Sequence, residues 1–513
     1  MSRFQTGSTR GRISRSAHRL LWLGTAAVLL AGCAVGPDYS RPQIPKTDSY
    51  RTGPIPQTTA SADTAGGQEQ KIRQGADVPG DWWTLFQSPA LNALVADALR
   101  NNPDIRSAHA ALAVAMDNVR AQQALYFPSI SANFNASRNS NGATLAPTLA
   151  SGQLLFNLYQ AQLNASWTID LWGGNRRAVE ALQAAADGER YQLEAAYLAL
   201  AANVVAAAVQ EASLREQIAA AQDIVRVETE SLDILKHQNQ AGQVAGADVA
   251  AQEAALAQAE QALLPLQKQL AQQRDLLTQL AGRTPADQVS QIFDLDAIKV
   301  PQDVPIGIPS KLVEQRPDIR IAEENVHAAS AQIGVAIANM LPNITITGGG
   351  GSAGTAMGQL FTAGSGFWSI AGGVTQPLFD GGALIARTRG ARDTYAQTVA
   401  QYQGTVDTAF QNVADALYAL EYDAKILQAA ATSERAAADS LSITRTQLRL
   451  GAVNYVALLT SQQAYQQAVI NRVQAQAARL SDTAALFQAI GGGWWNRPDA
   501  TDGRMADADD PKK

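Results

Sequence analysis

A tetrapeptide that occurs twice constrains the fold of this chain more than any other feature of its sequence. Pro-Asp-Ile-Arg begins at Pro103 and returns at Pro317, 214 residues later, and the same spacing separates Pro128 from Pro342. In both copies a helix-like segment joins the two landmarks, and a strand-like alternation follows the second proline. Equal spacing with the same change of period predicts an internal duplication of one large strand–helix unit.

Alternation of apolar and polar residues predicts four strands, two in each copy. In the first copy, 130–136 and 159–171 place apolar residues at every second position, with Ser, Asn, Gln and Thr between them. In the second copy the pattern returns at 344–346, before a glycine-rich loop, and at 368–374. Such strands suit a membrane barrel wall between lipid and water, and they equally suit a half-buried soluble sheet. The residues alone leave both readings open.

Two stretches predict helices far longer than those of globular domains. From 175 to 240 the chain has no proline, and at 1.5 Å per residue this gives a helix of about 100 Å. A turn at Gly242 follows, and apolar residues then recur every seven positions from 249 to 277, which is a coiled-coil pattern. Pro265 inside that row predicts a kink or local unwinding. The second copy repeats the plan, with Gly451 in the place of Gly242.

The N-terminus has the pattern of a lipoprotein export signal. Residues 1–32 contain five Arg and no acidic residue, and the apolar run 20–30 is too short to span a bilayer. The signal leads into Leu-Ala-Gly-Cys, whose Cys33 is the single cysteine of the chain. This motif resembles the bacterial lipobox, so we expect Cys33 to carry covalent lipid as the mature N-terminus. Ala34 in the next position resembles lipoproteins sent to the outer membrane.

Charge and motif content exclude several classes of function. Without residues 1–32 the chain has 35 Lys and Arg (40 minus 5) against 46 Asp and Glu, which disfavours a nucleic-acid partner. Its four histidines do not lie at metal-ligand spacing, so no metal site is expected. Gly349-x-Gly351-x-x-Gly354 matches a dinucleotide fingerprint but does not open a helix, and we reject it. No enzyme motif or other cofactor site is predicted.

The sequence therefore predicts six segments along the chain. They are a signal peptide (1–32), a lipidated and loosely ordered tether (33–80), a first repeat (81–282), a connector (283–309), a second repeat (310–490) and a flexible C-terminal tail (491–513). Trp82 and Trp83 begin the packed structure, and we interpret them as core anchors.

Several of these residues resemble one family. The start Cys33-Ala-Val-Gly-Pro-Asp-Tyr-Ser-Arg-Pro, the Trp82-Trp83 segment, both Pro-Asp-Ile-Arg motifs and Arg449-Leu450-Gly451 are similar to outer-membrane efflux lipoproteins of the NodT type, relatives of TolC. The resemblance covers nearly the whole mature chain. It implies a mainly α protein with a membrane β-barrel, built as a trimer with a 12-stranded barrel and a long α-helical coiled-coil barrel. Four strands cannot close an outer-membrane barrel alone, and counting by itself would also allow two or four copies.

The resemblance also implies the sites of contact and gating. The turns between the long helices, Gly242 and Arg449-Leu450-Gly451, are expected to face a periplasmic adaptor and an inner-membrane pump. Relatives carry a carboxylate ring at the periplasmic entrance, and the matching positions here are Thr460 and Gln463. Both are uncharged, so a charged gate is not expected.

Three functions fit these patterns. The first is the outer-membrane channel of a tripartite, RND-type efflux system that passively exports small molecules. The second is the same duct in a type I protein-secretion system. The third is a coiled-coil lipoprotein without a pore, which the four amphipathic strands disfavour.

Overall fold

The computed structural model describes residues 34–43, 49–140 and 155–497 of the 513-residue chain. The chain divides into two compact units, and each takes segments from both predicted repeats. The described residues of Met1–Arg41, Ala115–Ala186 and Asn325–Val399 form unit 1, and those of Pro42–Val114, Asp187–Glu324 and Ala400–Lys513 form unit 2.

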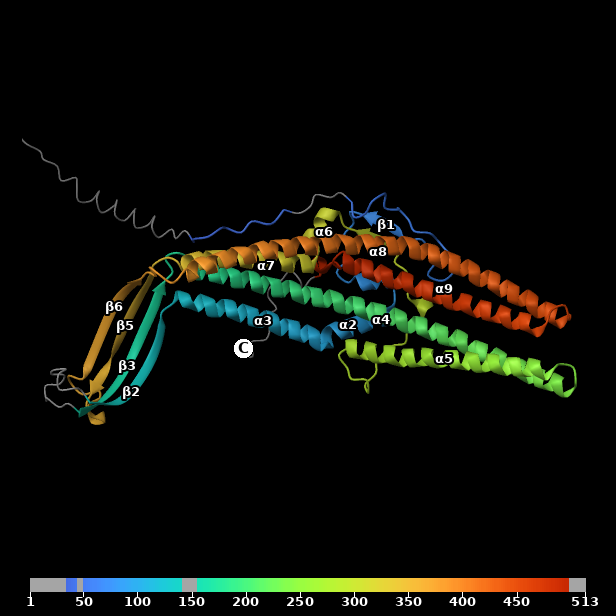
Figure 1. Cartoon of the computed structure of the whole chain (residues 1–513), viewed down its shortest axis with the longest axis horizontal. Helices are drawn as coiled ribbons and strands as arrows, with labels where there is room; N and C mark the ends of the chain where they lie inside the picture. Colours follow the sequence, from blue (N-terminus) through green and yellow to red (C-terminus); the bar gives the residue numbers. More distant parts are fainter. Residues whose placement is uncertain (1–33, 44–48, 141–154, 498–513) are drawn as a thin grey trace, which may run out of the picture. The chain divides into compact units, whose positions relative to one another are not determined.

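The long helices occur as two matched pairs. α4 (Gly174–Gln240) and α8 (Ala383–Arg449) both have 67 residues, and α5 (Gly246–Leu280) and α9 (Tyr455–Ala489) both have 35 (Figure 1). Each second helix begins 209 residues after its counterpart, since 383 minus 174 and 455 minus 246 are both 209. The equal lengths confirm the duplication and the long helices predicted from the sequence.

The shorter helices begin where proline allows a helix to begin. They are α2 (Pro89–Asn101), α3 (Pro103–Gln123), α6 (Pro309–Gln315) and α7 (Pro317–Ala338). A proline at the first helical position loses no intrahelical hydrogen bond, and its fixed φ suits the helix. Asn102, between α2 and α3, accepts a hydrogen bond from the backbone N–H of Asp104 at 2.7 Å through its side chain. Asn102 therefore separates α2 from α3.

Four antiparallel strands form one sheet in unit 1, in the order β2-β3-β5-β6 (Figure 1). They are β2 (Ser129–Ser140), β3 (Leu155–Ile169), β5 (Asn343–Gly354) and β6 (Gly366–Thr375). The prediction of four strands is confirmed for this sheet. The glycine run 348–354 was expected in a loop, but it lies within β5, because it pairs with β3 on one side and β6 on the other.

A second sheet was not predicted from the sequence. β1 (Lys71–Gln74) pairs in parallel with β4 (Asp303–Ile306), so the expected tether and the expected connector are joined in unit 2. Thr59 and Gln70 are buried, and Arg479 of α9 donates hydrogen bonds to both side chains. The composition of this segment does not suggest ordered structure. Its order comes from contacts with residues more than 200 positions away in the sequence.

The core of unit 2 confirms the role predicted for Trp82. Its side chain is 1% exposed and stacks on Phe487, with ring centroids 5.3 Å apart. The C-terminal segment differs from the prediction of a flexible tail. Gly491 to Gly493 are buried, and the indole N–H of Trp494 donates to the carbonyl oxygen of Gln315 at 2.6 Å. The two tryptophans of this segment give it apolar surface to bury, which holds it through Arg497.

Pro265 does not interrupt α5, which is helical at Pro265 and on both sides of it, so the expected local unwinding is absent there. Five short 3-10 helices complete the described elements: η1 (Trp82–Phe86), η2 (Ala124–Tyr126), η3 (Leu295–Ala297), η4 (Met357–Gln359) and η5 (Trp494–Asn496).

Candidate functional site

The registers of the four-stranded sheet join the separate alternations into two continuous faces. Residues directly opposite in an antiparallel pair point to the same side, so the pairings Ile130 with Ala165, Ala165 with Gly348, and Gly348 with Ile370 define one face. This apolar face carries Ile130, Ala132, Phe134, Ala136, Tyr159, Ala161, Leu163, Ala165, Trp167, Ile169, Ile344, Ile346, Gly348, Gly350, Trp368, Ile370, Gly372 and Val374. The same registers place the polar residues Arg138, Asn157 and Ser352 on this side, toward one end of the strands. The opposite, polar face carries mainly Ser, Asn, Gln and Thr, including Ser131, Asn133, Asn135, Gln160, Gln162, Asn164, Ser166, Thr168, Thr345, Thr347 and Ser369.

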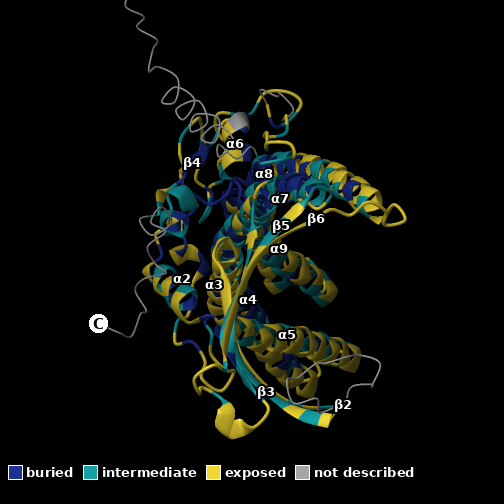
Figure 2. Ribbon diagram, turned by 90° about the vertical axis from the view of Figure 1, so that its left-hand side faces the viewer, coloured by how far each residue is buried: buried dark blue, intermediate teal, exposed yellow. Residues whose placement is uncertain are grey.

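The apolar face is uncovered within the described chain. Ile130 is 75% exposed, Ile370 73% and Trp368 79%, and exposed positions run along β2 and β6 (Figure 2). Isolated exposed apolar residues are ordinary, but a face that spans four strands marks contact with lipid or another protein. With one apolar and one polar face, the sheet has the pattern of a barrel wall that faces lipid outside and water inside.

The edges of this sheet are open in the chain. β2 and β6 are the terminal strands of the four, with 12 and 10 residues. An unpaired strand edge leaves backbone N–H and C=O groups without partners, and in lipid each such group costs several kcal/mol. A membrane position for this sheet therefore requires partner strands at both edges.

The residues where β3 ends hold the sheet to the following helix. The indole N–H of Trp172 donates to the carbonyl oxygen of Pro342 at 2.7 Å, so the first repeat contacts the second at this point. The carboxylate of Asp170 accepts the backbone N–H groups of Asn175 and Arg176 at 3.0 and 2.9 Å. These N–H groups belong to the first turn of α4, where a carboxylate is favoured.

The two turns predicted to contact an adaptor have one geometry. Gly242 has φ +72° and Gly451 has φ +70°, and both lie where a left-handed residue ends a helix. Gln243 N–H donates to Gln238 C=O at 2.8 Å, and the equivalent Ala452 N–H donates to Gln447 C=O at 2.9 Å. A Cβ on either glycine would meet no atom within 4 Å, so both turns are open to a partner.

The flanking residues of the second turn are also accessible. Leu450 is 78% exposed, and Arg449, the last residue of α8, donates to the Thr446 hydroxyl at 3.2 Å. Thr460 and Gln463 lie on α9 and are exposed, and the Thr460 hydroxyl donates to the carbonyl oxygen of Val456 at 3.0 Å. The one acidic residue of α9 is Asp482. The contact and gate roles of these positions stay predictions.

A buried polar cluster near the turns, which sequence reasoning missed, connects three long helices of unit 2. Gln252 of α5 is fully buried, and its amide N–H donates to the backbone oxygen and to the carboxylate of Glu228 on α4, at 2.8 and 2.6 Å. The phenol of Tyr455, at the start of α9, donates to the Gln252 amide oxygen at 2.7 Å. Burial raises the pKa of Glu228, and the hydrogen bond from Gln252 and the charge of Arg445 oppose that shift. The signal in the sequence was Glu228, which interrupts the coiled-coil spacing of Leu214, Ile218, Ala221, Val225, Leu232 and Leu235.

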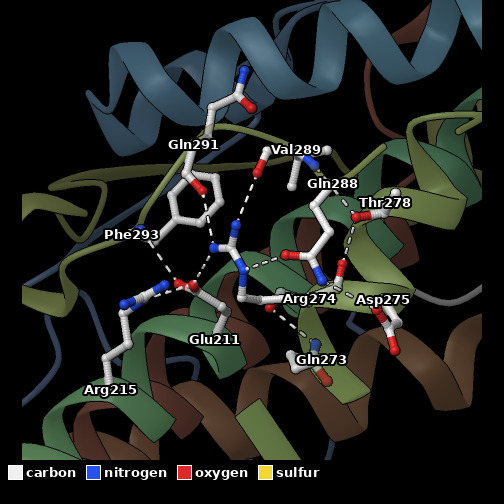
Figure 3. Close-up of polar contacts among 11 residues, drawn as sticks. Glu211, Arg215, Gln273, Arg274, Asp275, Thr278, Gln288, Val289, Gln291 and Phe293 are labelled. Carbon is white, nitrogen blue, oxygen red and sulfur yellow. Dashed lines mark hydrogen bonds and ion pairs between the residues drawn. The ribbon is translucent and has the colours of Figure 1, made fainter. Parts of the chain in front are cut away.

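A second buried cluster fixes α4, α5 and the chain that follows α5. Glu211 of α4 is fully buried and accepts from Arg215 at 2.6 Å and from Arg274 at 3.2 Å (Figure 3). Arg274 also donates to the carbonyl oxygen of Val289 at 2.9 Å, and the backbone N–H of Phe293 donates to Glu211 at 3.3 Å. A buried carboxylate with partners on all sides is costly to disturb, so this cluster fixes the connector against the helix pair.

Several features bear on metal binding, nucleotide binding and membrane spans in the described part of the chain. No group of three or more His, Cys, Asp or Glu residues there could hold a metal ion. The dinucleotide-like glycines Gly349, Gly351 and Gly354 lie within strand β5 and do not open a helix. Among the described helices, α4 has one window apolar enough to cross a membrane, but 56% of that window is buried inside the protein, as in a packed helix. Cys33, the predicted lipidation site, lies outside the described residues.

Comparison with known proteins agrees with this architecture. The family model of outer membrane efflux proteins matches residues 94–283 and 308–492, one match for each repeat. The probable efflux pump outer membrane protein TtgC of Pseudomonas putida is 31% identical over 484 residues, which cover 93% of this chain and 96% of that protein. Nodulation protein T of Rhizobium leguminosarum bv. trifolii is 27% identical over 480 residues, covering 91% and 96%.

Solved structures show the same fold. The outer-membrane channel OprN has a TM-score of 0.77 at 26% identity and covers 90% of this chain and 100% of its own. The CmeC outer membrane channel of Campylobacter jejuni has a TM-score of 0.81 at 23% identity, covering 91% and 97%, and supports the fold alone. The expected resemblance to NodT-type and TolC-like proteins is confirmed. The chain belongs to the outer membrane efflux protein family and is an efflux protein of the outer membrane.

Proposed function

We propose that this protein is the outer-membrane duct of a tripartite efflux pump, through which small molecules leave passively and without a catalytic step. The observation that carries the proposal is the four-stranded sheet with one continuous apolar face and one continuous polar face. The polar face would line the water-filled channel, and the apolar face would contact lipid.

Three copies would close the barrel with twelve strands. Two copies would give eight strands and four would give sixteen, so the choice of three follows the resemblance to TolC-like channels. The helices support closure by further copies, because surfaces buried in one repeat are exposed in the other. Ala181 and Ala184 of α4 are 3% and 1% exposed, whereas their equivalents 209 residues later, Gly390 and Asp393 of α8, are exposed. Ala181 and Ala184 are covered within the chain, and a neighbouring copy would cover Gly390 and Asp393 in the same way.

The duplication also predicts the register between copies. The pairings Ile130 with Ala165 and Ile344 with Val374 show that β5 follows β2 by 214 residues and β6 follows β3 by 209. The intrachain pair Leu163–Gly350 therefore corresponds to Gly372 (163 plus 209) opposite Ala136 (350 minus 214) of the next copy. Both residues lie on the apolar face, as a continuous barrel wall requires.

Cysteine cross-linking tests this register. Gly372→Cys combined with Ala136→Cys should give a covalent trimer on oxidation in outer membranes. The matched control, Gly372→Cys with Phe134→Cys, shifts the pair by two residues along the same face and should cross-link at least several-fold less. Efficient cross-linking of the control pair, or dimers as the limiting species, would contradict the register or the copy number.

The partners of the duct would bind at the two helical turns. Relatives such as TtgC are named as outer membrane proteins of efflux pumps. We assign a periplasmic adaptor and an inner-membrane pump to Gly242 and to Arg449-Leu450-Gly451, which are open and geometrically alike. Covalent lipid on Cys33 would add an anchor in the outer membrane.

The entrance would lack a charged gate. Thr460 and Gln463 carry no charge, so divalent cations applied from the periplasmic side should not block conductance. Planar-bilayer recording tests the duct itself: an inserted, folded oligomer should conduct once its turns are loosened by substitution. A folded oligomer that stays silent under those conditions would overturn the proposed function.

A further inference from the structure

The segment that follows the predicted lipidation site is bound to unit 1 and does not behave as a tether. The backbone N–H of Val35 donates to the carbonyl oxygen of Trp172 at 3.0 Å, where β3 has ended. Gly36 has φ +101°, and a Cβ there would lie 2.5 Å from the Cα of Gly334 on α7. A Cβ on Gly173 would lie 2.7 Å from the Cα of Ala34. The segment therefore lies in backbone contact with both repeats, at places where only glycine fits.

Arg177 of α4 holds the charged part of the segment. Its side chain is 6% exposed and donates to the Asp38 carboxylate at 2.7 Å and to Glu180 at 2.8 Å. Its Nε also donates to the carbonyl oxygen of Val35 at 3.3 Å. Asp38 itself is 95% exposed, so the buried guanidinium is the organising group, and the segment supplies two of its acceptors.

An aromatic contact extends the binding to α7. The ring of Tyr39 stacks on His327 with centroids 4.3 Å apart and an interplanar angle of 21°. The His327 Nε2 lies 3.2 Å from the second oxygen of Glu180, so Glu180 joins Arg177 of α4 to His327 of α7. The segment thereby crosses from a helix of the first repeat to a helix of the second.

We propose that Ala34–Tyr39 occupies a dedicated docking site for the mature N-terminus, made by Arg177, Glu180, His327 and Gly334, which fixes the lipid-bearing end beside the exit of β3. The inference rests on the proposed function, because the lipid and the membrane belong to it. A flexible tether of ten residues would allow the lipid anchor to move over about 15–20 Å. The docked segment instead holds the anchor in one position.

The site is not repeated at the equivalent positions of the other repeat. The positions equivalent to Arg177 and Glu180 in α8 are Ala386 and Arg389, since 177 and 180 plus 209 give 386 and 389. The positions equivalent to His327 and Gly334 in α3 are Ala113 and Arg120, by the offset of 214. Arg389, in the place of Glu180, is not a hydrogen-bond acceptor for a histidine. Arg120, in the place of Gly334, does not leave the space that the glycine leaves. In a ring of copies, the docked segment would thus fasten the seam within each chain and leave the seams between chains without it.

The test uses the full-length chain in outer-membrane vesicles, with spin labels on Ser40→Cys and Asn325→Cys, both of which are exposed in unit 1. A docked segment should give one narrow distance distribution. Gly36→Val should lower the ratio of docked to released segment about tenfold or more, because valine meets both the α7 backbone and an unfavourable φ. An unchanged distribution in that variant, or a broad one in the parent, would overturn the proposal.

A second variant covers the case in which Gly36→Val does not fold. Asp38→Asn with Tyr39→Ala changes side chains of the segment alone and should lower the same ratio about two- to tenfold. Asp63→Asn is the matched control, because Asp63 lies in the N-terminal region but outside the docked segment. It is 93% exposed and pairs with Arg435 at 3.3 Å. The control should leave the distances unchanged, and a broadening in it equal to that of the double variant would contradict the site.

Cys33→Ala, on a chain exported with a non-lipoprotein leader, tests whether the lipid or the protein contacts hold the segment. The distribution should stay narrow, because the protein contacts do the docking, and release of the segment would show that the lipid does it. Bilayer conductance of the Asp38→Asn, Tyr39→Ala variant separates this proposal from the proposed function. If this variant releases the segment but still conducts, the docking site is supported. If the spin-label distances of the parent are narrow but the chain never conducts, only the proposed duct function is refuted.

Discussion

The phenol of Tyr455 donates a 2.7 Å hydrogen bond to the amide oxygen of Gln252, and the amide nitrogen of Gln252 donates to Glu228. Through these three residues the start of α9 is tied to α4 and α5, with Gln252 and Glu228 buried and Tyr455 half-buried. The hairpin of the second repeat is therefore fastened to that of the first, and Tyr455 lies four residues after Gly451 of the predicted partner-binding turn.

Tyr455→Phe should loosen this connection. The phenylalanine retains the ring but leaves the Gln252 amide oxygen without its partner, at a cost of about 1–3 kcal/mol. We expect faster amide hydrogen exchange at the start of α9 and a higher open probability in planar bilayers. Tyr422→Phe serves as control, because Tyr422 is 55% exposed on α8, and it should change neither measurement. Equal effects of the two substitutions would contradict the role of Tyr455.

The pair Asp423 and Asp482 should make stability depend on pH. Burial and the neighbouring Asp482 raise the pKa of Asp423 to about 7, and Arg479 opposes the shift. A carboxyl whose folded-state pKa is raised binds more protons folded than unfolded, so stability is fully present below about pH 4 and is lost as pH rises through 7. Between pH 5 and 8 the thermal midpoint of unit 2 should fall.

Asp423→Asn should flatten this fall, because an amide cannot lose the proton. The variant should exceed the parent in midpoint at pH 8 by the equivalent of about 1 kcal/mol or more, measured by circular dichroism at 222 nm in detergent. Asp415→Asn is a suitable comparison on the same helix. A parent whose midpoint does not fall over this range, or an Asp423→Asn curve parallel to it, would refute the prediction.

Arg479 should be essential for holding the N-terminal segment in unit 2. Its side chain is 1% exposed and donates to the carbonyl oxygens of Gly66 and Gln68 and to the side chains of Thr59 and Gln70. Arg479→Met removes this donor from all four acceptors, of which the Thr59 and Gln70 side chains are buried, and should destabilise the contact by about 3 kcal/mol. Limited proteolysis should then cut near residues 59–70.

The control for Arg479 is Arg435→Met. Arg435 pairs with Asp63 at 3.3 Å, and both side chains are largely exposed, 59% and 93%, so its loss should cost less than about 1 kcal/mol. Proteolysis near residues 59–70 should remain at the level of the parent. If Arg435→Met exposes the segment as much as Arg479→Met does, the buried guanidinium is not what holds it.

A bulky side chain at the turns should weaken adaptor binding without preventing folding. Gly242→Val places a branched side chain at φ +72°, at a cost of about 1–3 kcal/mol, and adds bulk to an open surface. We expect co-purification with the cognate adaptor to be lost while bilayer conductance is kept. Gly246→Val is the matched control, since Gly246 lies at the start of α5 without a positive φ and with no neighbour within 4 Å of its Cβ. Retention of the adaptor by Gly242→Val would contradict this contact.

The sequence was sufficient for features that depend on local periodicity. Period-seven spacing, the lack of proline and helix-ending glycines predicted the long helices and their turns, because such helices carry their hydrogen bonds within one segment. Period-two spacing predicted the four strands of the large sheet in the same way, since alternation follows directly from strand geometry. The repeat at Pro103 and Pro317 predicted the matched lengths of α4 and α8.

What the sequence could not predict depends on partners distant along the chain. Lys71–Gln74 forms a strand beside Asp303–Ile306, and Gly491 to Arg497 is held by contacts with Gln315, Asp77 and Val78. The buried Gln252 and Arg479 look like surface residues in the sequence, because polar residues are mostly exposed. The docking of Ala34–Tyr39 was hidden for the same physical reason. A short segment without periodicity takes its conformation from the residues that receive it, and the tertiary structure alone brings those residues together.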